Sequence, residues 1–141
     1  MQTQKIRDMI IKKFNGCNGY VEIPLMKKGE SFTAKIVKDG VEVNNLDTQP
    51  LLKWEVFEKT IELLEASGGK AIKGDAMSKN SRLGEELLPI NSVEGYIAYE
   101  VYKNSIGSSV FRRISPISAI LAWVGLCENG RGYLKLKGSV S

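Results

Sequence analysis

The sequence predicts an α+β fold, because apolar residues at helical spacing and short alternating β segments occur together in one chain of 141 residues. Ile6, Ile10 and Phe14 recur at the spacing of one face of an amphipathic helix. Asp39-Gly40 lies between two alternating segments and favours a tight hairpin, because its turn positions need positive φ. Hydrophobic residues make up 43% of the chain, which is sufficient for a folded core.

Residues 1–47 are predicted to form one helix followed by a small antiparallel sheet. The helix is expected to end at Asn15 to Gly19, since paired Asn and Gly residues favour turns. Three β segments are expected over 20–26, 31–38 and 41–46, and the Asp39-Gly40 turn joins the last two. We therefore divide the chain into this N-terminal segment and a domain over 48–141.

The domain over 48–141 is predicted to contain three helices. Pro50 is expected near the start of the first helix, where its missing N–H costs nothing, and the double glycine at 68–69 ends it. A short strand is expected over 70–73. Ser92 is a good N-cap for the second helix, and Ser115 followed by a proline predicts the start of the third.

The chain is predicted to finish with a second hairpin. Residues 128–132 are rich in Asn and Gly and predict a tight turn, and residues 133–137 alternate as an exposed strand does. The order helix, strand, helix, helix, hairpin is that of a winged helix-turn-helix domain. We therefore expect a winged helix preceded by an N-terminal helix and a small antiparallel sheet.

Several motifs in this domain also occur in a known family. The sequence reads Val-Phe-Arg-Arg-Ile at 110–114, ends its third helix with Val-Gly-Leu at 124–126, and carries Arg-Gly-Tyr at 131–133. With the opening helix and double glycine over 51–69, these segments resemble the N-terminal winged-helix domain of Mrr-type restriction endonucleases. The resemblance implies DNA binding. No lysine is preceded two residues earlier by Asp or Glu, so the E-x-K half of that family's nuclease site is missing.

The charge distribution also favours DNA as the partner. Residues 101–141 carry a net charge of +5, and residues 51–100 carry −3. A basic end beside an acidic middle suits a polyanion, although scattered solvated lysines would give the same count. We expect duplex DNA to be contacted mainly through its phosphates. The residues expected to contact DNA are Arg112, Arg113, Ser115, Ser118, Arg131, Lys135 and Lys137.

The third helix is expected to point Ser118, Ala119, Ala122 and Trp123 outward. None of these is an Arg, Asn or Gln that could read a base edge bidentately, so sequence-specific recognition is not expected. Trp123 is predicted to be an interface residue. It either contacts a partner, as in a homodimer, or is covered by residues 1–47.

The remaining composition argues against catalysis. The chain has no histidine, and Cys17 and Cys127 are isolated, so we expect neither an enzyme nor a metal or other cofactor. Neither a membrane span nor a signal peptide is recognisable, and we expect a cytoplasmic protein of prokaryotic or phage type without membrane contact. The alternative function is a protein–protein interaction module on a winged-helix scaffold, since fold does not fix function.

Overall fold

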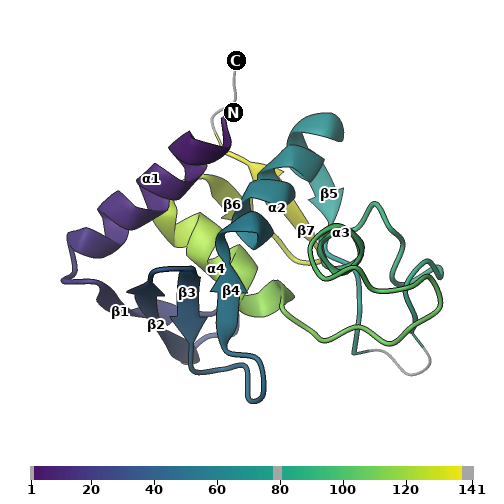
Figure 1. The fold of residues 1–141 in the computed structure, drawn as a ribbon, viewed down its shortest axis with the longest axis horizontal. Helices are drawn as coiled ribbons and strands as arrows, with labels where there is room; N and C mark the ends of the chain where they lie inside the picture. Colours follow the sequence, from purple (N-terminus) through teal and green to yellow (C-terminus); the bar gives the residue numbers. More distant parts are fainter. Residues whose placement is uncertain (1, 78–80, 138–141) are drawn as a thin grey trace.

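The computed structural model describes residues 2–77 and 81–137. Within these ranges the chain forms four helices and two small antiparallel sheets (Figure 1). The predicted α+β class is therefore confirmed. In the described part of the chain, every helix falls short of the length and apolarity needed to cross a membrane.

The first sheet has four strands in the order β1-β2-β3-β4, and helix α1 precedes it. The Asp39-Gly40 hairpin is confirmed, because it joins β2 to β3 with Val37 opposite Gly40. A glycine is required at position 40, where a Cβ atom would lie 2.0 Å from the Leu52 carbonyl oxygen. The bounds of these elements are α1 Thr3–Asn15, β1 Tyr20–Pro24, β2 Ser31–Val37, β3 Gly40–Val43 and β4 Leu51–Lys53.

The helix start predicted at Pro50 is wrong, because residues 51–53 form strand β4. Leu52 pairs with Val41 and is fully buried, and Val43 N–H donates to the Pro50 carbonyl oxygen at 2.9 Å. Helix α2 begins only at Trp54, whose indole N–H donates to the Lys38 carbonyl oxygen. The boundary expected after residue 47 thus separates β4 from the sheet to which it belongs.

The second sheet has three strands in the order β5-β7-β6. The strand expected over 70–73 and the C-terminal hairpin are confirmed. Ser92 caps the following helix as expected, since its Oγ accepts a hydrogen bond from Gly95 N–H at 3.1 Å. The bounds of the elements after β4 are α2 Trp54–Ala66, β5 Lys70–Ile72, α3 Val93–Glu100, α4 Ile114–Val124, β6 Cys127–Asn129 and β7 Tyr133–Leu136.

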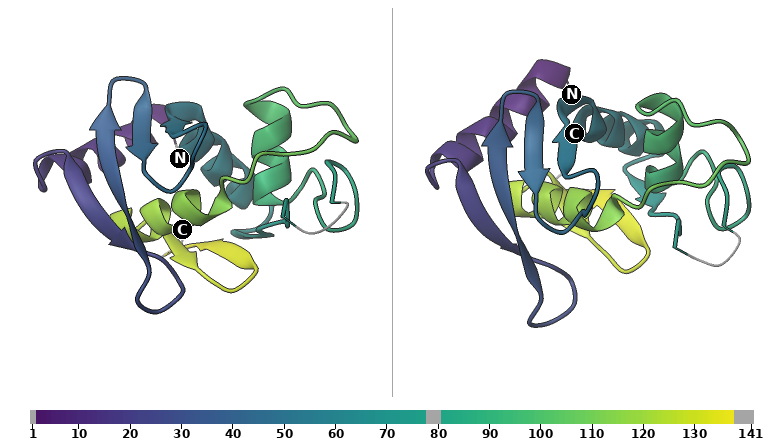
Figure 2. Two further views of the ribbon diagram at one scale, coloured as in Figure 1. Left: turned by 90° about the horizontal axis from the view of Figure 1, so that it is seen from below. Right: turned by 60° about the horizontal axis from the view of Figure 1, so that its bottom comes forward.

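One continuous core joins both parts of the chain. It includes Ile10 and Phe14 of α1, Phe57 of α2, and Ile117 and Ile120 of α4, all of them fully buried. Helix α1 contacts both α2 and α4. Figure 2 shows α4 between the four-stranded sheet and the β6–β7 hairpin. The N-terminal segment therefore packs directly on the helix that was expected to face DNA.

Candidate nucleic-acid interface

Helix α4 is covered by the N-terminal segment. Ser118 and Ala119, which were expected to point outward, are only 1% and 3% exposed. β1 and α1 both contact α4, and buried residues occupy most of its first two turns. The prediction that Ser118 contacts DNA is wrong, because its hydroxyl group is enclosed between α4 and its neighbours.

Trp123 is half-buried and makes its contact inside the molecule. Its ring meets the ring of Phe14 edge to face, with 5.0 Å between centroids, and Lys13 Nζ lies 5.5 Å from its centroid. Of the two interpretations of this residue, coverage by residues 1–47 is confirmed. The homodimer stays a prediction.

The prediction that Arg113 contacts DNA is also wrong, because the structure buries this side chain. The residue is 3% exposed, and its guanidinium group lies between two aromatic rings, 3.6 Å from the centroid of Tyr102 and 4.8 Å from that of Phe111. It donates hydrogen bonds to the Gln49 side chain and to the Phe111 carbonyl oxygen. The hydrogen bond to Gln49 links the segment before α4 to the N-terminal half of the chain. Because the guanidinium group is enclosed, Arg113 is not placed to contact a DNA phosphate.

Glu94 takes the capping role that the sequence assigned to Ser115. Helix α4 begins at Ile114 and has no side-chain cap of its own. The buried Glu94 carboxylate, from α3, accepts the N–H groups of Arg113 and Ile114 at 2.9–3.0 Å. Burial raises the pKa of Glu94 to about 7, although these hydrogen bonds and the charge of Arg113 favour its ionised form.

Sequence reasoning missed Glu94, but a signal was present. Glu94 is the second residue after the Ser92 cap of α3 and lies three and four residues before Ile97 and Ala98, which share the buried face of that helix. An acidic side chain on such a face needs polar partners inside the protein. Its own N–H donates to the Lys73 carbonyl oxygen at 2.9 Å, so Glu94 links Lys73 to the start of α4.

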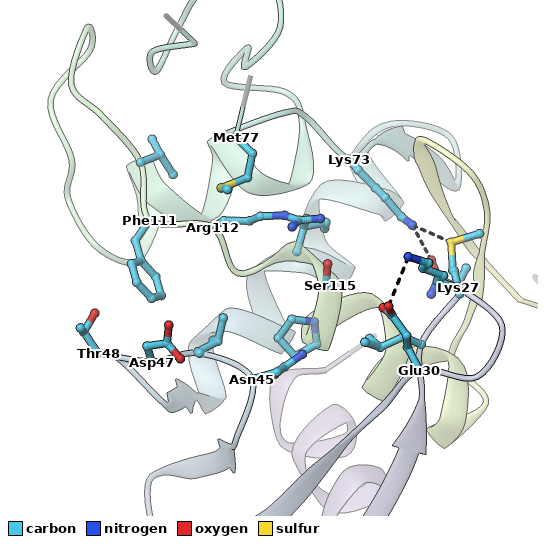
Figure 3. A pocket seen from close by; sticks show the side chains of 17 residues that line it. Lys27, Glu30, Asn45, Asp47, Thr48, Lys73, Met77, Phe111, Arg112 and Ser115 are labelled. Atoms are coloured by element: carbon cyan, nitrogen blue, oxygen red, sulfur yellow. Dashed lines mark hydrogen bonds and ion pairs between the residues drawn. The ribbon is translucent and has the colours of Figure 1, made fainter. Parts of the chain in front are cut away.

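A groove of about 850 Å³ opens beside the N-terminal end of α4 (Figure 3). Its walls come from the loops after β1 and β3, from Lys73, from the segment before α4, and from Asn129. Ser115 lines the groove and is half-buried, so its hydroxyl is available to a ligand although it does not cap the helix. The groove thus opens directly beside the first residues of α4, Ile114, Ser115 and Pro116.

Lys73 and Arg112 supply positive charge to this groove. Lys73 Nζ donates to Asn129 Oδ1 and lies 3.3 Å from Met26 Sδ, and burial together with the charge of Arg112 lowers the pKa of Lys73. Arg112 is exposed, and within residues 2–77 and 81–137 no hydrogen bond or ion pair engages its guanidinium group. Two cations therefore face one space without a carboxylate bonded to either in the described part.

The hairpin carries the other exposed basic residues of the predicted contact set. Arg131 lies in the turn between β6 and β7, and Lys135 and Lys137 follow it, all exposed. The turn adjoins the groove, because Lys73 N–H donates to the Gly132 carbonyl oxygen at 2.9 Å. Lys135 lies opposite Lys70 and Glu128 on the outer face of the three-stranded sheet and does not line the groove.

The residues predicted to contact DNA therefore do not form one surface in the structure. Arg112 and Ser115 line the groove, Arg131 is beside it, Lys135 and Lys137 are exposed on the hairpin, and Arg113 and Ser118 are buried. Lys73 was not predicted, since a single lysine after a short strand gives no signal. In the described ranges, no group of three or more His, Cys, Asp or Glu side chains is placed to hold a metal ion.

Comparison of the chain with protein-family models, with curated proteins and with solved structures finds no match.

Proposed function

We propose that this chain is a non-catalytic winged-helix protein that binds DNA through its phosphates at the groove beside α4. The observation that carries the proposal is the convergence of Lys73 and Arg112 on that groove, without a carboxylate bonded to either in the described residues. Two like charges side by side repel each other, and a bound anion relieves that repulsion.

The winged-helix assignment is supported by the order of elements in the second part of the chain. A helix, a strand, two helices and a hairpin follow one another from α2 to β7, and the hairpin completes a sheet with β5. The motifs shared with Mrr-type N-terminal domains support it too. One departure is the long connection over 101–113, which replaces the short turn between the two helices of a helix-turn-helix.

The contact set proposed for DNA differs from the one expected from the sequence. It comprises Lys73, Arg112 and Ser115 in the groove, and Arg131 in the adjoining turn. Because the N-terminal segment covers α4, this helix is not expected to enter the major groove. Phosphate contacts position a protein without reading bases, so affinity should depend little on sequence.

The salt dependence of duplex binding tests this proposal. Each neutralised phosphate contributes about −0.9 to the slope of log affinity against log salt concentration. Replacing Arg112 with Ala and Lys73 with Met should therefore reduce the slope by about two and weaken binding to all duplexes alike. Lys73→Met keeps the aliphatic stem, and Arg112 is exposed, so the fold should survive. Fluorescence anisotropy titrations at several salt concentrations measure the slope.

The matched control is the double variant Lys35→Ala and Lys38→Ala. These lysines are exposed near the β2–β3 turn and do not line the groove, so the variant loses the same charge elsewhere. Its slope should stay close to that of the unmodified chain. Absence of duplex binding at low salt, or equal slopes for the two double variants, would reject the proposal.

The alternative function, a protein–protein interaction module, is favoured by one observation. Leu87 and Ile106, on the two long connections around α3, are 51% and 60% exposed, and Met77 is 68% exposed. Exposed apolar side chains of this size suit a protein partner. Failure of the salt test would leave this interpretation in first place.

A further inference from the structure

We propose that the groove receives an unpaired nucleotide from a single-stranded extension of the DNA, with its phosphate at Lys73 and Arg112 and its base against Phe111. The inference rests on the proposed DNA binding and adds the form of DNA that the site prefers. It is carried by the size of the groove, by the chemistry of its two walls, and by the coverage of α4.

The size of the groove suits one nucleotide better than a duplex. Its volume of about 850 Å³ lies in the range of pockets that enclose small molecules. A B-form duplex has a major groove about 12 Å wide, into which a protein helix normally inserts. In this molecule α1 and β1 cover the helix that would make that insertion. A duplex can therefore present backbone phosphates to Lys73 and Arg112 at the mouth of the groove but cannot enter it, whereas a single strand can.

One wall of the groove is basic and the opposite wall carries hydrogen-bond acceptors. A nucleotide has a phosphate that suits the first wall and a base that suits the second. Lys73 and Arg112 form a basic wall that suits a phosphate (Figure 3). Asp47 and Thr48 lie across from Arg112 in the same view and present oxygen atoms. The amino groups of bases are donors that such acceptors can bind.

Phe111 lies between the two walls and offers a ring for stacking. Figure 3 shows its ring projecting from the segment before α4 toward Thr48 and Asp47. Phe111 is half-buried, and the guanidinium group of Arg113 lies 4.8 Å from its centroid, which holds the ring in place. Aromatic side chains beside basic residues are the usual platform for unpaired bases.

An acidic peptide fits these walls less well than a nucleotide does. Asp47 lines the groove beside Thr48, and Glu30 lines it beside Lys27, so a ligand with several carboxylates would meet negative charge in both places. A nucleotide carries its charge at one end and neutral hydrogen-bond donors at the other. Inorganic phosphate would use the basic wall alone and leave Phe111 and Asp47 without a ligand.

The test compares a blunt duplex with the same duplex carrying a single-stranded extension, using the full chain at one salt concentration. Stacking of one base on an aromatic ring contributes about five- to 150-fold in affinity, so the extended DNA should bind tighter by a factor in this range. Phe111→Leu should reduce the ratio of the affinities for extended and blunt DNA to about one. Phe111→Tyr retains a ring and should retain the preference.

Tyr20→Leu is the matched control, because Tyr20 is 58% exposed on β1 and does not line the groove. It should leave the preference unchanged. Competition gives a second measurement that does not depend on any variant. A nucleoside monophosphate should displace the extended DNA at lower concentration than inorganic phosphate or an acidic peptide does.

The outcomes separate this inference from the proposed function. Equal affinity for blunt and extended DNA, or a preference that survives Phe111→Leu, would overturn the inference and leave phosphate binding intact. A nucleoside monophosphate that competes no better than phosphate or the peptide would also overturn it. Absence of binding to either DNA would reject the proposed function and this inference together.

Discussion

Arg112 and Arg113 are neighbours in the chain, yet one side chain is exposed and the other is buried. Neighbouring side chains in a non-helical segment commonly point in opposite directions, so one of the two can face the groove while the other faces the interior. The motif predicts that two charges precede α4, and it does not distinguish their directions. Tyr102 and Gln49, which enclose Arg113, come from distant segments and determine which arginine is buried.

Glu94 makes the free energy of unfolding depend on pH. Its pKa is raised from 4.5 to about 7 in the folded protein, so the fold binds the proton more tightly than the unfolded chain does. This contribution to stability is complete below about pH 4.5 and is lost as the pH rises toward 7. At about 1.4 kcal/mol per pKa unit, the loss amounts to about 3 kcal/mol.

Glu94→Gln isolates this dependence, because the amide keeps the shape of the side chain but does not titrate. The stability of the unmodified chain relative to this variant should fall by about 3 kcal/mol between pH 4.5 and pH 7. Urea denaturation followed by circular dichroism at several pH values measures the difference. A difference that stays constant across that range would contradict the assignment.

Among the elements, α4 shows where prediction from sequence ends. Its apolar positions and its end at Gly125 follow from local pattern, and Gly125 does adopt the left-handed conformation of a helix C-cap. Local pattern does not predict which face of α4 is exposed, because α1 and β1, which lie far earlier in the chain, cover part of its surface. Strand β4 is a similar case, since residues 51–53 join a partner strand instead of extending the adjacent helix.

The contact between α1 and α4 can be tested at Phe14, which is fully buried against Trp123. Phe14→Ala should destabilise the fold by about 3–5 kcal/mol, because it removes a large buried ring and leaves a cavity. The emission of Trp123 should also shift to longer wavelength, measured in a Trp54→Phe background so that one tryptophan reports. Lys12→Ala, at an exposed position of α1, is the control and should change neither quantity.

At the scale of the whole molecule, local patterns predicted the fold class, both hairpins and the order of most elements. They did not predict that residues 1–47 and the later helices share one core, which depends on contacts between distant segments. The candidate site was predicted only in part for the same reason. Arg112 and Ser115 belong to a motif, whereas Lys73 reaches the groove through the pairing of β5 with β7.

A shared core predicts that the chain unfolds in one cooperative transition. Phe14, Phe57 and Ile120 belong to the same buried cluster, so the N-terminal segment cannot separate without exposing the interior of α2 and α4. Differential scanning calorimetry should give one peak whose calorimetric and van't Hoff enthalpies agree. Two resolved peaks would show instead that the two parts fold independently.

The packing of α1 on α4 also has a consequence for synthesis on the ribosome. Ile6, Ile10 and Phe14 are synthesised before α4, which completes their surroundings and begins 100 residues after Phe14. Until then the apolar face of α1 has no complete cover and is open to chaperones or to other nascent chains. Closure of the core must await pairing between segments far apart in the chain, a step whose entropic cost slows folding.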